Sequence, residues 1–388
     1  MKTIVNIISR EHPLAAYLFV KENYEEGDKL IFISAHENFD CITPLVKCLK
    51  IDKEQVQRIV LRRDEDKYTY ERICRVISCA IPKEGLYYVN LAGGTRYMAL
   101  SVQHVFANYN AQFFYTQTRE NLIVKTIFDN SIFDNDDEII PIKHKTRLGE
   151  YFEIHGLQHD LDQTTPPIRD EEQTNYMFEL FSKRKLRGSD YQILDILREK
   201  YRNWKYINIS EVEHPINDKM IPIPTLGRFL NFLHFVPSQK GVLQREELEY
   251  LTGGWFEEYV YHLVKKNIHP DDIAIGVHID GCTEIQHNNE LDVSFIKNNQ
   301  LFVIECKSGI NSESMFNEIV YKVCALKEVL LGMACNSYIF SLKKDENGDL
   351  KKIAKYMDII FCDYDCLTKP DKVEKVMKEM RKTIGVQS

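Results

Sequence analysis

Two apolar segments of this chain have acidic residues inside them, and this combination restricts the folds open to it. The first segment is residues 290–296 (ELDVSFI) and the second is residues 301–309 (LFVIECKSG), with a polar spacer at residues 297–300 between them. The apolar runs and the short spacer predict two neighbouring β-strands. A carboxylate inside an apolar strand is costly unless a compensating charge is present. A divalent cation supplies such a charge, so the pattern predicts a sheet built around a metal site.

The polar residues of these two strands suit that chemistry. Asp292 and Glu305 offer hard oxygen ligands for Mn²⁺ or Mg²⁺, and the backbone carbonyl of Cys306 offers a third. Lys307 lies two residues after Glu305, so on a regular strand it points to the same face, where it would orient an attacking water. The Cys306 thiol points to the opposite face, and we interpret it as structural. The pattern predicts a metal-dependent nuclease core; the alternative is two edge strands with solvent-facing charges.

A predicted helix at residues 254–266 precedes the two strands and adds a further acidic group. Its first turn contains Glu257 and Glu258, which are about 100° apart around a helix, so only one can face the strands. We favour Glu257, because Phe-Glu followed by Val260, Leu263 and Val264 matches the helix that usually precedes such a pair of strands. The catalytic residues predicted from sequence are therefore Glu257 and the three charged residues of the strands.

The N-terminal part of the chain, residues 1–148, alternates short apolar runs with helical patterns. Strands are predicted at residues 3–8, 29–34, 57–61, 85–91 and 111–115, and helices at residues 14–24, 41–49, 70–80 and 96–109. Repeated β-α units of this length predict an α/β domain with a Rossmann-like, doubly wound parallel sheet. Residues 122–138 predict a terminal hairpin.

The fourth predicted strand ends in a glycine pair that leads directly into a helix. Gly93 and Gly94 allow the backbone to approach a ligand, and the amides of a helix N-terminus attract anions. Thr95 adds a hydroxyl and Arg96 a guanidinium that can bind phosphate. The loop is neither GxGxxG nor a Walker loop, so an NAD or ATP site is not predicted.

Other polar residues follow the first two strands at the same edge of the sheet. They are Ser9, Arg10 and Ser34. Ligands of doubly wound sheets bind at the carboxyl edge, so we expect these residues to surround the same ligand as the glycine loop. Arg10 could equally be a solvated loop residue.

Residues 149–170 break the alternation and predict a linker or hinge between two domains. The second domain is predicted to span residues 171–388, with a helical extension at 171–202 and a proline-rich loop at 215–224. The region 171–245 has no recognisable motif, and its role stays open. After the two acidic strands we expect a helix at 313–331, strands at 336–342 and 359–363, and a helix at 372–382.

Composition narrows the class of protein further. A net charge of −8 argues against a protein that coats nucleic acid, although it allows a local basic groove. The ten cysteines form no CxxC pair, which favours reduced thiols over disulfides or zinc. No apolar run reaches the length of a membrane span, and we expect a cytoplasmic protein.

The C-terminal pattern resembles the PD-(D/E)XK nuclease superfamily of restriction-endonuclease-like folds. Asp292 matches the first acidic position, Glu305-Cys306-Lys307 matches E-x-K, and the helix with Glu257 precedes them in the usual order. Together with the Gly-Gly-Thr-Arg loop of the N-terminal domain, nearly the whole chain resembles the CARF-domain ancillary nucleases of type III CRISPR systems.

This resemblance implies an antiviral defence function. Such proteins form homodimers that bind a cyclic oligoadenylate, usually cyclic tetra-adenylate, as allosteric activator. Their activated nuclease domains cut single-stranded RNA and DNA, or nick duplex DNA, with Mn²⁺ or Mg²⁺. The residues that the resemblance places at the ring are Gly93, Gly94, Thr95 and Arg96, with Ser9, Arg10 and Ser34 nearby.

Two other functions are compatible with the sequence. One is a nucleotide-sensing regulator whose nuclease-like domain binds DNA but is catalytically silent. The other is an ungated restriction or repair endonuclease whose N-terminal domain serves only assembly. The ring size of the activator, and whether the N-terminal domain degrades it, stay open.

Overall fold

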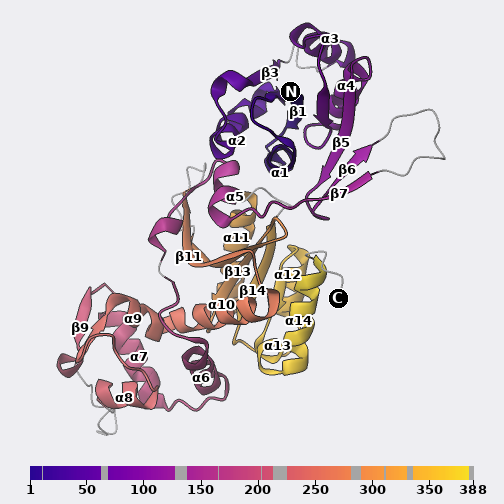
Figure 1. Cartoon of the computed structure of the whole chain (residues 1–388). Helices are drawn as coiled ribbons and strands as arrows, with labels where there is room; N and C mark the ends of the chain where they lie inside the picture. The colour runs from indigo at the N-terminus through magenta and orange to yellow at the C-terminus, as the bar shows by residue number, and fades with distance from the viewer. Residues whose placement is uncertain are drawn as a thin grey trace.

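The computed structural model describes residues 1–10, 12–62, 69–126, 138–164, 166–201, 203–212, 225–280, 290–309, 312–329 and 335–383. Two α/β domains lie one above the other, and a smaller helical module flanks the lower one (Figure 1). The proline-rich loop expected at residues 215–224 lies outside the described residues. No helix in the described part of the chain has the length and apolar character needed to span a membrane.

The N-terminal domain contains a seven-stranded sheet of order β3-β2-β1-β4-β5-β6-β7. Its strands are β1 (Thr3–Ile8), β2 (Lys29–Ala35), β3 (Val56–Leu61), β4 (Tyr87–Asn90), β5 (Ala111–Gln117), β6 (Leu122–Thr126) and β7 (Glu138–Pro141). Strands β1 to β5 are parallel, as predicted, and β6 and β7 extend the sheet as the antiparallel hairpin. All five predicted parallel strands are therefore confirmed.

Helices cover both faces of this sheet. They are α1 (Pro13–Asn23), η1 (His36–Cys41), α2 (Ile42–Leu49), η2 (Lys53–Gln55), α3 (Tyr70–Ala80) and α4 (Arg96–Phe106). Alternate residues of the buried strands point to opposite faces, so Phe32 packs with α1 and α2, whereas Ile33 packs with α3 and α4. The result is the three-layer, doubly wound arrangement that the β-α alternation predicts.

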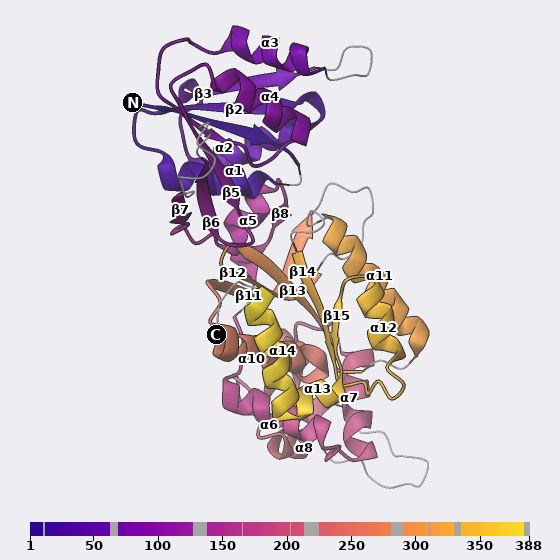
Figure 2. The same ribbon diagram turned by 90° about the vertical axis from the view of Figure 1, so that its right-hand side faces the viewer.

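The segment predicted as a linker differs from that expectation. It contains α5 (Leu148–Ile154), β8 (Gln158–His159) and η3 (Leu161–Gln163). In α5 the side chains of Leu148, Tyr151 and Phe152 are buried in a core that also includes residues of α1, α2 and the C-terminal sheet. Strand β8 pairs with the edge of that sheet, so the segment joins the two domains at their junction (Figure 2). An extended, solvated linker would not bury these side chains.

The C-terminal domain is built on a mixed six-stranded sheet of order β15-β14-β13-β12-β11-β8. Its further strands are β11 (Asp272–Asp280), β12 (Glu290–Lys297), β13 (Gln300–Lys307), β14 (Cys335–Ser341) and β15 (Ile360–Cys362). Its helices are α10 (Trp255–Ile268), α11 (Glu313–Val329), α12 (Asp349–Tyr356), α13 (Tyr364–Thr368) and α14 (Pro370–Thr383). Helices α10 and α14 pack on one face and α11 and α12 on the other. The fold is a restriction-endonuclease-like α/β domain.

The helical module lies between the linker segment and α10. It comprises α6 (Glu171–Ser182), α7 (Gly188–Lys200), β9 (Tyr206–Asn208), η4 (Ile209–Glu211), α8 (Leu226–Phe232), β10 (Val242–Gln244), α9 (Arg245–Glu249) and η5 (Tyr250–Gly254). Stacked rings attach α6 to α10: Phe181 lies 4.4 Å from Trp255, measured between ring centroids. The predicted helix at 171–202 is two helices, because Arg184 adopts a left-handed backbone (φ 51°) after α6.

The turn between β12 and β13 makes several polar contacts between the two domains. Asn299 is 1% exposed, and its Nδ2 donates to Asn121 Oδ1 (2.7 Å) and to the His144 carbonyl (2.9 Å). Its Oδ1 accepts the backbone N–H of Thr146 at 2.8 Å. We call Asn299 and these three partners the interdomain clamp. Gln300 adds a 2.9 Å bond to a carbonyl of the β5–β6 turn.

Candidate active site and ligand-binding edge

Strands β12 and β13 separate at the acidic residues. Their antiparallel pairing ends at Val293 and Ile304. Asp292 and Glu305 would form the next pair in this register, but they are not paired. The Asp292 carboxylate occupies the resulting fork, where its Oδ2 accepts the backbone N–H of Cys306 at 2.7 Å. On the other side, the register with β11 skips Asp292, opposite Gly276 with its left-handed φ of +63°. The fork thus frees a buried carboxylate from the regular ladder.

Two lysines neutralise the carboxylates of the fork. Lys307 Nζ lies 3.0 Å from Asp292 Oδ2 and 2.7 Å from Glu305 Oε1, which confirms that Lys307 and Glu305 point to the same face. Lys322, on α11, donates to both Glu305 oxygens at 3.0 and 3.1 Å. Sequence reasoning missed Lys322. The available signal was a lysine within the apolar run IVYKVCA of the predicted helix.

Burial and like charges shift the protonation equilibria of the fork. Burial and the neighbouring Glu305 charge raise the pKa of Asp292 to about 6. Burial lowers the pKa of Lys307, but the charges of Asp292 and Glu305 outweigh it and raise that pKa above its ordinary value. Asp292 and Glu305 are 5% and 1% exposed, so their negative charges are held close together away from solvent. Such a site favours a cation.

The structure distinguishes the two glutamates of α10. Glu258 turns away from the fork, and its carboxylate accepts the backbone N–H groups of Ile168 (2.8 Å) and Arg169 (3.0 Å). Glu257 faces the fork: burial, followed by the negative charges of Asp292 and Glu290, raises its pKa to about 8. The orientation favoured from sequence therefore agrees with the geometry.

The acidic fork fits a hard divalent cation, although it is not a cluster of many side-chain ligands. Among the described residues, no three or more His, Cys, Asp or Glu side chains are grouped as a metal site. The donors present are the carboxylates of Asp292 and Glu305, which are buried and repel one another. Within a strand, the N–H and C=O of a residue point to the same side, so the Cys306 carbonyl also faces the fork. Water would complete a coordination sphere of this kind.

Cys306 packs as a core residue. Its side chain is 5% exposed and belongs to the apolar core beneath α10, and burial raises the pKa of its thiol well above the ordinary value. A neutral, buried thiol is a poor nucleophile. All cysteines in the described ranges are free, in agreement with the prediction of reduced thiols.

For the metal-dependent nuclease that the sequence predicts, replacement of Lys322 by Met is expected to weaken cleavage by roughly 10–100-fold, the usual effect of losing a group that orients a metal ligand. The reason is that Glu305 would lose two of its hydrogen bonds while Lys307 stays in place. Cleavage rates titrated against Mn²⁺ measure this effect, and the variant should need more metal. An unchanged metal requirement would show that Lys322 has only a structural role.

The glycine loop of the N-terminal domain is packed tightly against β1. Gly93 (φ +104°) and Gly94 (φ +63°) both have left-handed backbones, and a Cβ at either position would lie 2.4 Å from an atom of Ile7. Only glycine fits here, for conformational and steric reasons. Thr95 caps α4 by accepting the Met98 N–H at 3.2 Å.

The other predicted ligand residues lie at this carboxyl edge. Arg96 and Arg10 are exposed. Ser9 follows β1 and Ser34 lies near the end of the adjacent strand β2. Both are buried, and neither hydroxyl has a hydrogen-bond partner among the residues that the structure describes. Buried hydroxyls are normally paired, so two unpaired ones at one edge are consistent with a site for a polar ligand.

A Rossmann-like domain with a glycine loop, joined to a restriction-endonuclease-like domain with an acidic fork, defines a two-domain sensor-nuclease architecture. Comparison with known protein families gives a matching family for each of the two domains. The Card1 CARF domain matches residues 3–151, and the Card1-like endonuclease domain matches residues 244–369. The chain therefore combines a Card1-type CARF domain with a Card1-like endonuclease domain.

Solved structures share this architecture. Protein VC1899 from Vibrio cholerae superposes with a TM-score of 0.75 at 18% identity, covering 100% of this chain and 99% of that one. Can2 from Sulfobacillus thermosulfidooxidans, in complex with cyclic tetra-adenylate, gives 0.66 at 19% identity, covering 99% of each chain. A type III CRISPR defence DNA nuclease activated by cyclic oligoadenylate gives 0.55 at 11% identity, covering 97% of this chain and 51% of that one. No curated protein matches the sequence significantly.

Proposed function

We propose that this chain is a cyclic-oligoadenylate-activated, metal-dependent nuclease of type III CRISPR antiviral defence. It acts as a homodimer in the cytoplasm, cuts single-stranded DNA or RNA or nicks duplex DNA, and responds to cyclic tetra-adenylate. Its domains are a CARF sensor at residues 1–148, a junction at 149–170 and a nuclease at 171–388. The free thiols of the described cysteines suit a reducing compartment.

The acidic fork is the observation that carries the nuclease proposal. Asp292, Glu305 and the Cys306 carbonyl would hold Mn²⁺ or Mg²⁺, which lowers the pKa of bound water and stabilises charge on a phosphate. Lys307 stays protonated between the two carboxylates and is placed to orient the attacking water and to neutralise the scissile phosphate. Glu257 faces the same fork, where its raised pKa suits the uptake and release of a proton.

The carboxyl edge of the CARF sheet supports the sensor proposal. Can2, whose architecture this chain shares, was solved with cyclic tetra-adenylate. Here the unpaired hydroxyls of Ser9 and Ser34 and the exposed guanidinium of Arg96 supply donors for phosphate and ribose, with Gly93, Gly94, Thr95 and Arg10 alongside. A two-fold homodimer suits a cyclic ligand, because each protomer presents the same edge to half of the ring.

Polar contacts, together with the turns that lie between them, connect the ligand edge with the fork and support gating. Asn90 Oδ1, just before the glycine loop, accepts the N–H of Ala92 at 3.2 Å and the Thr116 hydroxyl at 3.2 Å. Thr116 lies on β5, and the β5–β6 turn that follows contains Asn121 of the interdomain clamp. The clamp holds the turn of the β12–β13 hairpin, which carries Asp292 and Glu305 at its other end. A ligand that shifts the glycine loop can therefore change the positions of the carboxylates in the fork.

Cleavage with Mn²⁺ is expected to require cyclic tetra-adenylate. The assay measures cleavage of labelled single-stranded DNA and RNA, and nicking of a supercoiled plasmid. Each substrate is tested with and without the ligand. Equal cleavage in both conditions would indicate an ungated endonuclease. Ligand binding by calorimetry with no cleavage under Mn²⁺ or Mg²⁺ would indicate a catalytically silent regulator.

A further inference from the structure

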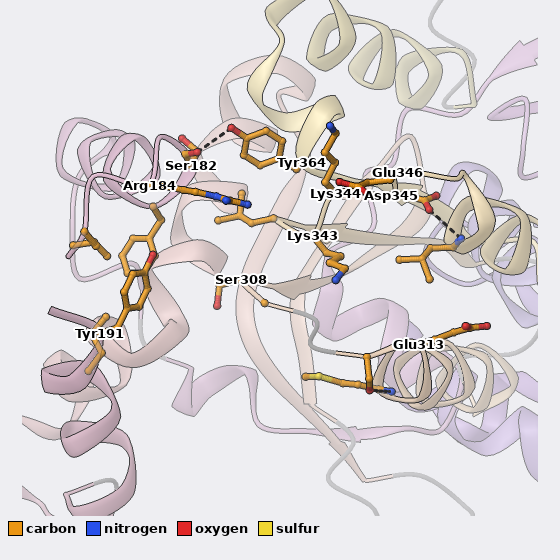
Figure 3. A pocket seen from close by; sticks show the side chains of 18 of the residues that line it. Ser182, Arg184, Tyr191, Ser308, Glu313, Lys343, Lys344, Asp345, Glu346 and Tyr364 are labelled. Atoms are coloured by element: carbon orange, nitrogen blue, oxygen red, sulfur yellow. Dashed lines mark hydrogen bonds between the residues drawn. The ribbon is translucent and has the colours of Figure 1, made fainter. Parts of the chain in front are cut away.

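A cavity of about 1510 Å³ opens directly beyond the catalytic strand β13. One wall is formed by α6 and α7 of the helical module, and the other by the start of α11 and the loop between β14 and α12 (Figure 3). Ser308 and Gly309, immediately after Lys307, lie on its lining. The cavity exceeds the range of roughly 300–1,000 Å³ typical of small-molecule sites. Its size and position suit a segment of a polymer that leads into the fork.

Basic side chains reach this cavity from both walls. Arg184 extends from the end of α6, and Lys343 and Lys344 extend from the loop after β14 (Figure 3). In the part of the chain that the structure describes, none of the three forms an ion pair. Cations held without partners along a cavity are the usual donors for phosphate groups.

The acidic side chains of the lining are largely engaged elsewhere. Asp195 and Asp349 form ion pairs within their own helices at 3.3 and 2.9 Å. Asp345 accepts two backbone N–H groups at the start of α12, at 3.3 and 3.0 Å. Asp345, Glu313 and Glu346 keep their charge, against the three unpaired cations. The charge along the cavity is therefore close to balanced in a chain whose net charge is −8, and the cations act as individual phosphate donors on its two walls.

An aromatic ring is presented on the wall formed by the helical module. Tyr191 is 40% exposed and contacts Phe181 edge-on, with ring centroids 6.3 Å apart. Phe181 is in turn stacked on Trp255, so the ring of Tyr191 is supported from behind. Exposed rings next to cations are typical of surfaces on which unpaired bases stack.

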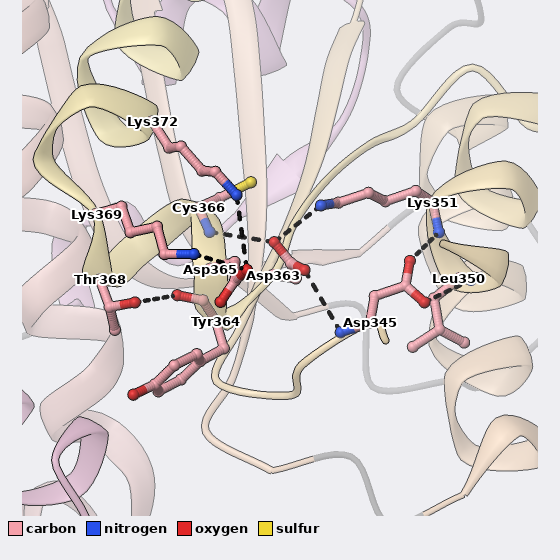
Figure 4. Close-up of polar contacts among 10 residues, drawn as sticks. All are labelled: Asp345, Leu350, Lys351, Asp363, Tyr364, Asp365, Cys366, Thr368, Lys369 and Lys372. Atoms are coloured by element: carbon pink, nitrogen blue, oxygen red, sulfur yellow. Dashed lines mark hydrogen bonds and ion pairs between the residues drawn. The ribbon is translucent and has the colours of Figure 1, made fainter. Parts of the chain in front are cut away.

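The two walls are held in place by buried contacts. Asp363 is 2% exposed and accepts the N–H of Asp345 at 3.4 Å and the Lys351 ammonium at 3.0 Å, which fixes the loop that carries the lysines (Figure 4). The hydroxyl of Tyr364 donates to the Ser182 carbonyl at 2.9 Å and ties α13 to α6. The cavity is therefore a formed groove rather than a gap between independent parts.

We infer that this groove binds single-stranded nucleic acid, with phosphates on Arg184, Lys343 and Lys344 and an unpaired base on Tyr191. The strand then passes Ser308 to reach Lys307 and the fork. This assigns a substrate-binding function to the helical module, whose sequence contains no recognisable motif. The inference rests on the proposed nuclease function for the fate of the strand, but binding can be measured without cleavage.

Fluorescence anisotropy tests whether the groove binds single strands. It measures the binding of a labelled single-stranded oligonucleotide to the full-length protein in EDTA, with and without cyclic tetra-adenylate. The double variant Arg184→Glu/Lys343→Glu is expected to raise Kd at least tenfold. The slope of log Kd against log salt should fall by about 0.7 for each lost phosphate contact. The matched control is Lys375→Glu/Lys378→Glu, which makes the same charge change on the exposed side of α14 and should leave Kd within twofold.

Tyr191 separates base stacking from charge. Tyr191→Ala is expected to weaken single-strand binding by roughly five- to one-hundred-fold, whereas Tyr191→Phe keeps the ring and should bind like the wild type. A duplex of equal length cannot place a base on the ring, so it should bind more weakly and be insensitive to Tyr191→Ala. Parallel DNA and RNA strands identify which of the two the groove takes.

The outcomes separate this inference from the proposed function. If the wild type cleaves but the Arg184 and Lys343 variant binds and cuts like the control, the groove inference is wrong and the nuclease proposal stands. If the wild type binds single strands through these residues but cuts nothing with Mn²⁺ or Mg²⁺, the groove stands and the nuclease proposal is wrong. Absence of any single-strand binding by the wild type overturns the groove.

Discussion

Replacement of Glu305 by Gln is expected to reduce cleavage by roughly 10²–10³-fold or more, as the loss of a central electrostatic group in an active site typically does. Gln keeps the shape of the side chain but removes the negative charge that two lysines and a divalent cation would share. The side chain is 1% exposed, so no solvent-derived group can replace it. Single-turnover cleavage with Mn²⁺ and saturating cyclic tetra-adenylate measures the effect.

The neighbouring substitutions Asp292→Asn and Lys307→Met are expected to act in the same direction, because all three groups meet in one fork. Glu379→Gln makes the same chemical change on the exposed side of α14 and should cleave like the wild type. Thermal melting establishes that each variant is folded. Retention of near wild-type rates by all three fork variants would remove the assigned active site.

Replacement of Asn299 by Gly is expected to abolish most of the ligand activation while the CARF domain still binds its ligand. Glycine accepts the left-handed backbone at this position (φ 60°), so the loss is confined to the amide and its three hydrogen bonds across the domain junction. Coupling energies between sites are typically 1–3 kcal/mol, or about 5–150-fold, so removing one main route should reduce the activation ratio at least tenfold.

The measurement compares cleavage with and without cyclic tetra-adenylate, together with ligand affinity by calorimetry. Asn298→Gly is the matched control, because it changes the preceding residue of the same turn and leaves the clamp amide in place. Its activation ratio should stay close to that of the wild type. An Asn299→Gly variant that is activated as strongly as the wild type would show that the signal takes another route.

Much of the fold follows from short-range patterns. The strand at Thr3–Ile8 has the predicted bounds because it is a continuous apolar run. The helix at Tyr70–Ala80 has the predicted bounds because its apolar residues repeat strongly with a 3.6-residue period. Helix α5 escaped prediction for the opposite reason. It is only seven residues long, and its apolar side chains are stabilised by contacts with both domains, which no local pattern contains.

The candidate active site shows the same division. The period of a strand places Glu305 and Lys307 on one face, and this required only their spacing. Lys322 lies on α11 and approaches Glu305 only because that helix packs on the sheet, so its contribution is a matter of tertiary contact. The sequence only favours Glu257 over Glu258. In the folded chain the backbone amides of the 166–170 segment bind the Glu258 carboxylate and so turn it away from the fork.

The sequence by itself therefore determined the two α/β domains, their order, and the glycine loop and acidic strands that place the chain among the CARF-domain nucleases. These features depend on local periodicity and on residues close together in the chain. The tertiary structure decided the fork between β12 and β13, the second lysine, the clamp at Asn299 and the groove beside Ser308. Each of these depends on groups distant in sequence, which only the packing of helices, sheet and domains brings into contact.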